Sequence, residues 1–241
     1  MAGALSLGGL RADPSDALAW PPASAYAAEV PTAWFDLALD LVRATPGFSP
    51  PVASRAFGYA GAALHEALAA GLSGGSFAGR LNGLSPPPAP ANHVYHWPTT
   101  ANAALAAILR ALFPTASAAN LDALDALERR FAEEGRAVLP FGVYKRSVRR
   151  GQDVAAHVFA WSTSDGGHEG FRSNFPPYTP PTGPGLWEPT PPGFQPALQP
   201  YWGTNRPFAL SSGATCAPPP PLPYSEVPGR ASTRTRTTAT S

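Results

Sequence analysis

The stretch from residue 161 to 210 constrains the fold most, because it combines many prolines with many large aromatic side chains. More than half of the 31 prolines lie from Pro176 onward. Interleaved with them are the aromatic residues Phe175, Tyr178, Trp187, Phe194, Tyr201, Trp202 and Phe208. A disordered linker normally contains few aromatics, because each one exposed to water leaves a large apolar surface unburied. The pattern therefore predicts an extended strap, residues 166–228, whose aromatic side chains anchor it on a helical body.

The body that precedes the strap shows helical periodicity. Trp34, Leu37 and Leu41 recur at intervals of three and four residues, the spacing of one helix face. Similar patterns predict helices over residues 29–45, 51–71, 99–113, 118–137 and 143–162. The second of these is rich in alanine and glycine, so neighbours can approach it closely, and it is predicted to be a central helix of the bundle. No useful stretch alternates as a β-strand does, so the predicted fold is all-α: an antiparallel helical bundle of about five helices.

The chain divides by composition into four parts. Residues 1–28 are interpreted as a leader or loop, 29–165 as the helical bundle, and 166–228 as the strap packed on that bundle. Residues 229–241 contain no apolar residue larger than alanine and are predicted to be a disordered tail. The start of the chain has no basic region typical of a secretory signal. The protein is cytoplasmic as written, or exported if its true start lies upstream, and both interpretations stay open.

Charge and composition exclude several classes of partner. The formal net charge is +1 and only 14% of residues are charged, so no electrostatic footprint for nucleic acid or an anionic membrane is present. No apolar run approaches the roughly 20 residues that a membrane-spanning helix needs. The single cysteine, Cys216, excludes an internal disulfide and a cysteine-based zinc site. It lies in a proline run and is interpreted as an inert thiol.

Several stretches, in order along residues 30–226, together resemble one known family. They are AWFDLALDLVRATPGFSPPVASRAFGYAGAALHEAL, HWPTTANAALAAILRALFP, GQDVAAHVFAWSTSDGG, YTPPTGPGLWEPTPP and YWGTNRPFALSSGATCAPPPPLPYSE. Each is weak alone, but the ordered series is similar to bacterial vanadium-dependent haloperoxidases, which are relatives of type-2 phosphatidic acid phosphatases. The resemblance implies an α-helical fold in which a second, C-terminal bundle carries an oxyanion site.

The resemblance also implies which motifs hold the oxyanion: Lys-x6-Arg-Pro, Pro-Ser-Gly-His and Ser-Arg-x5-His-x3-Asp. Their cationic side chains and backbone amides form a fixed cradle for vanadate or phosphate. This sequence has the pair Arg206-Pro207, but Gln199 stands where the lysine is required. Ser54-Arg55 is followed by His65, which is too far along, and no Pro-Ser-Gly-His occurs. We therefore assign no catalytic, cofactor-binding or metal-binding residue, and expect vanadate only in an intact relative.

Histidines and carboxylates offer three candidate sites. His93 and His96 have a spacing that could place two imidazoles on one metal, but no further ligand is nearby, so loop or packing roles are favoured. His168 with Asp165 and Glu169 could bind a cation, or could close the preceding helix and begin the strap. The third candidate, the acid–base pair His65-Glu66, is interpreted as a hydrogen-bonded pair on a helix surface or between helices.

Basic and proline-rich residues offer two more candidates. A basic patch that could attract an oxyanion is formed by Lys145, Arg146, Arg149 and Arg150. Their spacing on one side of the predicted helix favours a solvated face instead. The run PPPPLPY resembles ligands of proline-binding domains, although a structural role in the strap is favoured.

Three functional hypotheses follow. The first is a truncated haloperoxidase or acid phosphatase relative that is inactive because it lacks the oxyanion motifs; a frameshift near Val227 would explain why the sequence there changes to low complexity. Whether the parent is a peroxidase or a phosphatase stays open. The second is a non-catalytic helical interaction domain with a proline-rich docking strap. The third is a chain whose oxyanion site is supplied by a separately encoded catalytic half. As partners, a missing C-terminal catalytic half and a homo-oligomer both stay open.

Overall fold

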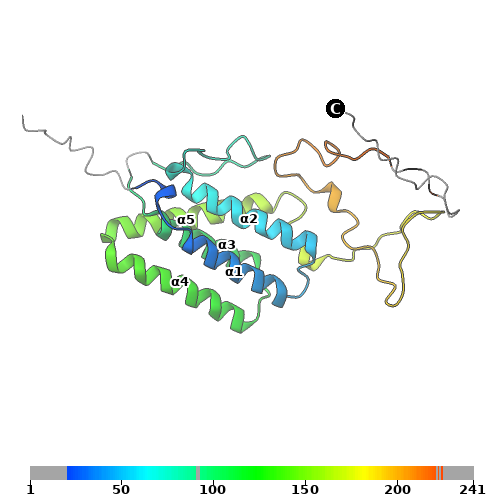
Figure 1. The fold of residues 1–241 in the computed structure, drawn as a ribbon, viewed down its shortest axis with the longest axis horizontal. Helices are drawn as coiled ribbons and strands as arrows, with labels where there is room; N and C mark the ends of the chain where they lie inside the picture. The colour runs from blue at the N-terminus through cyan, green and yellow to red at the C-terminus, as the bar shows by residue number, and fades with distance from the viewer. Residues whose placement is uncertain (1–20, 91–92, 221, 223, 225–241) are drawn as a thin grey trace, which may run out of the picture.

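The computed structural model describes residues 21–90, 93–220, 222 and 224, and within these residues it is entirely helical and irregular, without strands. The α-helices are α1 (Glu29–Ala44), α2 (Pro50–Leu68), α3 (Trp97–Leu112), α4 (Ala118–Val138) and α5 (Phe141–Ser162). Short 3-10 helices are η2 (Ala23–Ala25), η3 (Ala69–Gly71), η4 (Gly170–Arg172) and η5 (Trp202–Thr204). Short connections reverse the chain between α1 and α2 and between α4 and α5 (Figure 1). The predicted all-α helical bundle is confirmed.

Local sequence explains where the helices begin. The Ser117 side chain accepts a hydrogen bond from the backbone N–H of Asn120, which caps α4. Helix α2 opens with prolines in its first turn, where the missing N–H costs nothing. Helix α3 begins at Trp97, two residues before the predicted start, because His96 rather than a threonine occupies the N-cap position.

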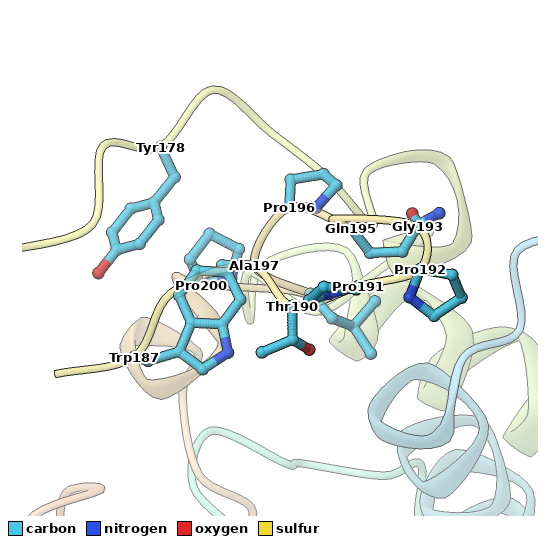
Figure 2. A pocket seen from close by; sticks show the side chains of 11 residues that line it. Tyr178, Trp187, Thr190, Pro191, Pro192, Gly193, Gln195, Pro196, Ala197 and Pro200 are labelled. Carbon is cyan, nitrogen blue, oxygen red and sulfur yellow. The ribbon is translucent and has the colours of Figure 1, made fainter. Parts of the chain in front are cut away.

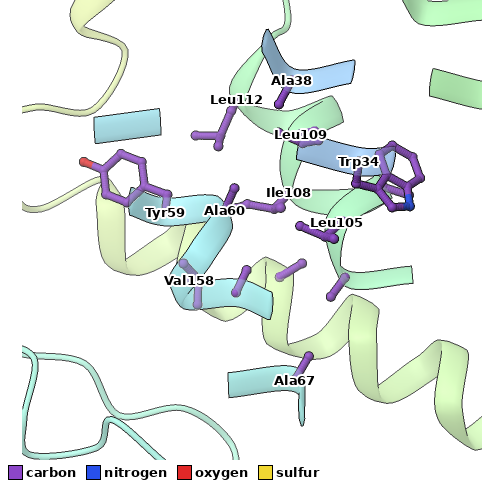
Figure 3. Packing of buried hydrophobic residues seen from close by; sticks show 14 of the residues in the cluster. Trp34, Ala38, Tyr59, Ala60, Ala67, Leu105, Ile108, Leu109, Leu112 and Val158 are labelled. Atoms are coloured by element: carbon purple, nitrogen blue, oxygen red, sulfur yellow. The ribbon is translucent and has the colours of Figure 1, made fainter. Parts of the chain in front are cut away.

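Next to α2, which was predicted to be a central helix, helix α3 occupies the centre of the bundle. It packs against α1, α2, α4 and α5, whereas α2 packs mainly against α3 and α5. Most of the α3 side chains are buried, and Leu105 and Ile108 are fully so. Figure 3 shows these residues between Trp34 of α1, Ala60 of α2 and Val158 of α5. The alanines of α2 do allow close approach, but they form one wall of the core rather than its centre.

Helices α3 and α5 approach so closely at Gly151 that no larger residue fits. A Cβ atom there would lie 2.4 Å from the Thr100 carbonyl oxygen and 2.7 Å from the Ala104 nitrogen. Because these are backbone atoms, Gly151→Ala must push the helices apart, and we expect it to lower the free energy of unfolding by about 1–3 kcal/mol.

The matched control is Gly61→Ala in α2, where an added Cβ meets nothing within 4 Å. Relief of the glycine entropy penalty is expected to raise stability there by about 0.5–1 kcal/mol. Urea unfolding followed by circular dichroism measures both. Equal effects of the two substitutions would contradict the close packing at Gly151.

The segment that follows α5 is extended and mostly projects away from the helices (Figure 1). Trp202 and Phe208 are half-buried against the bundle, as expected of anchors. The other aromatics predicted as anchors, Phe175, Tyr178, Trp187, Phe194 and Tyr201, are 40–61% exposed. That part of the prediction was wrong, because the prolines carry these side chains beyond the reach of the helices. The predicted tail, 229–241, and most of the predicted leader lie outside the described residues.

Candidate functional site

A buried polar junction joins the end of α5, helix α2 and the strap. The Asp165 carboxylate accepts hydrogen bonds at 2.6 Å from both Arg55 Nη2 and Tyr59 OH. Its other oxygen accepts from the backbone N–H of Gly167 at 2.8 Å. The Asp165 side chain is fully buried and that of Arg55 is 11% exposed, so this is a desolvated ion pair. Both carboxylate oxygens are satisfied, as a buried charge requires.

Arg55 and Tyr59 can meet the same carboxylate because they lie four residues apart on one face of α2. Arg55 Nε also donates to Tyr59 OH at 2.8 Å. Burial and the hydrogen bond to Asp165 raise the pKa of the Tyr59 hydroxyl well above its ordinary value. Tyr59 is therefore held neutral, as a hydrogen-bond donor to the carboxylate. This arrangement fastens elements together and presents no free acid or base.

Arg206 fastens the strap to the same junction. Its backbone N–H donates to the Asp165 carbonyl, and its own carbonyl accepts from Arg55 Nη2, both at 2.8 Å. Its guanidinium donates to the Trp161 carbonyl at 3.0 Å and to Ser164 Oγ at 3.2 Å. The Arg206-Pro207 pair noted in the sequence therefore closes a tertiary contact. Gln199, which stands where the family motif has lysine, donates to the Gly170 carbonyl at 2.9 Å.

The strap itself contains a hollow of about 670 Å³. Its lining residues come from positions 178–200, and Figure 2 shows Tyr178 and Trp187 among the prolines that form it. No charged residue lines it. The PPPPLPY run lies only partly within the described residues, so its predicted structural role stays a prediction. Cys216 is exposed.

The histidines predicted to be candidate ligands have separate structural contacts. His96 Nδ1 lies 2.8 Å from Thr99 Oγ1 and caps α3, and its ring packs edge-on against Tyr26. His93 packs against Tyr95. Among the described residues, no group of three or more His, Cys, Asp or Glu side chains could hold a metal. The packing interpretation is confirmed for His96.

We expect the fold to lose stability when the pH falls from about 7 to about 5, partly through His96. Burial lowers the pKa of His96 from its ordinary value of 6.5. Because the unfolded chain then binds the proton more readily, this contribution is complete above the unfolded pKa and is lost as the pH falls through the folded pKa. Protonation would also remove the acceptor that caps α3.

His96→Asn keeps a capping acceptor and removes the titration. Between pH 7 and pH 5, the melting temperature of this variant should fall less than that of the unsubstituted protein. Identical slopes of melting temperature against pH in the two proteins would show that His96 does not carry the effect.

His168, Asp165 and Glu169 do not converge on a common point. His168 Nδ1 lies 2.8 Å from Ser162 Oγ at the last residue of α5, which agrees with a role in closing that helix. Asp165 turns inward to the junction, and Glu169 forms an exposed ion pair with Arg172 at 2.9 Å. The cation-site interpretation has no support from this geometry.

His65 and Glu66 both bind the loop after η3 rather than each other. His65 Nε2 lies 2.8 Å from the Gly75 carbonyl, and its ring stacks on Phe77. The buried Glu66 carboxylate accepts from Ser76 Oγ at 2.8 Å and from the Phe77 N–H at 2.5 Å. The predicted pair is thus corrected to two separate contacts from α2 to this loop.

The predicted solvated basic face is wrong for Arg150. Its side chain is buried, with the residue only 8% exposed, and donates to the carbonyls of Glu66 at 2.9 Å and Pro87 at 2.5 Å. Lys145 and Arg149 are exposed, and Arg146 is half-buried. The basic patch is therefore not one solvated face: some of its side chains are exposed, and others line a groove beside the loop that precedes α3.

The helices first define the class of protein, which is an all-α helical bundle. Among the described residues, no helix is long and apolar enough to cross a membrane. One solved structure narrows this to a particular fold. It is the crystal structure of a protein described as the first bacterial vanadium-dependent iodoperoxidase, with a TM-score of 0.67 and 29% sequence identity. The predicted resemblance to the bacterial vanadium-dependent haloperoxidases is confirmed. No family model and no curated protein matches the sequence.

The match covers the two chains unequally. It includes 83% of this chain but 46% of the iodoperoxidase chain, so this chain spans about half the length of that relative. The half-length resemblance expected from the sequence therefore holds at the level of structure.

Proposed function

We propose that this chain is the non-catalytic helical half of a haloperoxidase-like protein. Alone it neither oxidises halide nor hydrolyses phosphate esters. The observation that carries the proposal is the unequal match, in which this chain corresponds to about half of a vanadium-dependent iodoperoxidase. Oxyanion chemistry then depends on residues outside the sequence of this chain.

The residues that resemble the family motifs do not fit a vanadate cradle. Such a cradle needs cationic side chains whose donors are free to hold the oxyanion. The two terminal nitrogens of the Arg206 guanidinium instead donate to Ser164 Oγ and the Trp161 carbonyl, and its Nε atom is buried inside the protein. Arg55 holds Asp165, Tyr59 and the Arg206 carbonyl. Arginines already engaged with protein groups would have to break these contacts first, which supports the proposal of an inactive chain.

The test is an activity assay on the purified chain. Iodide oxidation is measured with added vanadate and hydrogen peroxide, and phosphatase activity with p-nitrophenyl phosphate. We expect both rates to equal those of a heat-denatured sample of the same preparation. Iodide oxidation that requires both vanadate and the folded chain would refute the proposal.

A second candidate is a non-catalytic interaction domain with the strap as its docking surface. It is favoured by the exposed aromatics of the strap and by the hollow beside them. A bundle that lacks its other half should aggregate and bind an apolar fluorescent dye strongly. A self-sufficient domain should instead be monodisperse, melt cooperatively and bind little dye. Sedimentation velocity with a dye titration distinguishes the two candidates.

A further inference from the structure

A groove of about 400 Å³ lies between the first half of α5 and the loop that precedes α3. Proline residues and Tyr95 form its apolar wall, and Arg146, Arg149 and Arg150 form its charged side. His93 and Asp153 complete the lining. Its volume is in the range of small-molecule sites. It is separate from the strap hollow and from the Asp165 junction, with which it shares no residue.

Arg150 is a buried cation without a carboxylate partner among the described residues. Within these residues it forms no ion pair, and its two hydrogen bonds go to the backbone carbonyls of Pro87 and Glu66. The nearby carboxylates are engaged elsewhere: Glu66 accepts from Ser76 and Phe77, and Asp153 pairs with Arg149. Burial lowers the pKa of the Arg150 guanidinium, and the charge interactions with Tyr95, Glu66 and Asp153 offset this only in part. A buried charge of this kind is costly unless an opposite charge accompanies it.

Donor atoms also remain unused at this position. The Nε atoms of Arg146 and Arg150 are both buried and have no hydrogen-bond partner in the part of the chain that the structure describes. Among the described residues, the ion-pair partner of Arg149 is Asp153 at 3.5 Å, with side chains 84% and 58% exposed. Such an exposed pair is weak and exchanges readily for another anion.

The charge of the groove sets the charge of its ligand. Three arginines oppose one aspartate, which leaves a net +2 when His93 is neutral. A dianion would neutralise this net charge, and guanidinium forks match the oxygens of a phosphate group. We propose that this groove binds a phosphate group, either free or carried on a small molecule. This site is built from other residues than the family motifs and does not depend on the proposed function.

The test is isothermal titration of the full chain with inorganic phosphate and, separately, with phenyl phosphate. Inorganic phosphate shows whether the free ion is enough for binding. Phenyl phosphate shows whether binding also needs an apolar group that contacts the proline wall. Saturable binding of either at one site per chain is expected. Absence of saturable binding of both up to about 10 mM would overturn the proposal.

Substitutions locate the site. Arg146→Gln removes a charge-assisted contact and should weaken binding by about 10- to 100-fold. Arg149→Gln changes an exposed side chain, so it should fold normally, and it should weaken binding by about three- to tenfold. The matched control is Lys145→Gln, which removes the same charge from the same helix at a residue that does not line the groove. An equal loss in the control would show non-specific attraction and overturn the assigned site.

Thermal melts without phosphate confirm that each variant is folded. Different measurements test the two proposals: titration tests phosphate binding in the groove, and the activity assay tests the proposed function. Loss of phosphate binding would leave the activity result unchanged, and iodide oxidation by the chain would not alter the dependence of binding on Arg146.

Discussion

Asp165→Ala is expected to lower the free energy of unfolding by about 3–5 kcal/mol. The substitution leaves Arg55 nearly buried without its counter-ion and deprives Tyr59 of its acceptor. It also removes the side-chain contact that holds the turn at Gly167. Removing one member of a buried pair costs more than the pair contributes, because the remaining charge stays desolvated. Urea denaturation followed by tryptophan fluorescence measures the loss.

The strap should loosen in the same variant, because the lost carboxylate positions Arg55, whose Nη2 donates to the Arg206 carbonyl of the strap. Faster chymotrypsin cleavage after Phe208, which is half-buried against the bundle, reports this release. The control is Glu169→Ala, which removes an ion pair with side chains 57% and 40% exposed. Exposed ion pairs contribute about 0–1 kcal/mol to stability, so the unfolding free energy and the cleavage rate of this variant should be close to those of the unsubstituted protein. A loss in Asp165→Ala as small as in the control would mean that the junction does not fasten the strap.

The helices could be predicted because each one depends on a local pattern. Of the predicted α1 stripe, Trp34 and Leu41 are buried as their spacing indicates, and Leu37 is half-buried. The same logic could have found the buried arginine. Val143, Ser147, Arg150 and Val154 follow one another at intervals of three and four residues, and all of them are buried. Arg150 was assigned to solvent because its charge was given more weight than its position on this stripe.

The junction could not be predicted from local pattern, because its members are far apart in the sequence. Arg55 and Asp165 are separated by 110 positions, and nothing near either residue indicates the other. Only the four-residue spacing of Arg55 and Tyr59 was visible. The prediction that most strap aromatics anchor on the helices was wrong for a related reason. Whether an aromatic side chain in an extended segment reaches a helix depends on the path of the chain, which composition does not determine.

Trp34→Ala is expected to cost about 3–5 kcal/mol, because it leaves a large cavity beside α3. Trp34 is 0% exposed, and its Nε1 donates to Asn102 Oδ1 at 2.8 Å. Asn102 in turn donates to the Glu128 carbonyl, so this side chain links α1 to α3 and α4. Deleting the indole therefore removes packing and leaves the Asn102 amide oxygen unpaired.

Two further variants separate these contributions. Trp34→Phe keeps most of the ring but not the N–H, so its cost should be about 1–3 kcal/mol, the cost of leaving a buried acceptor unsatisfied. Trp187→Ala in the strap, where the side chain is 51% exposed, should change the unfolding free energy by less than about 0.5 kcal/mol. Urea unfolding of the three variants should give the order Trp34→Ala, Trp34→Phe, Trp187→Ala. If the strap variant cost as much as the core variant, the tryptophan of the strap would have to pack on the helices, and the extended path of residues 178–200 would be wrong.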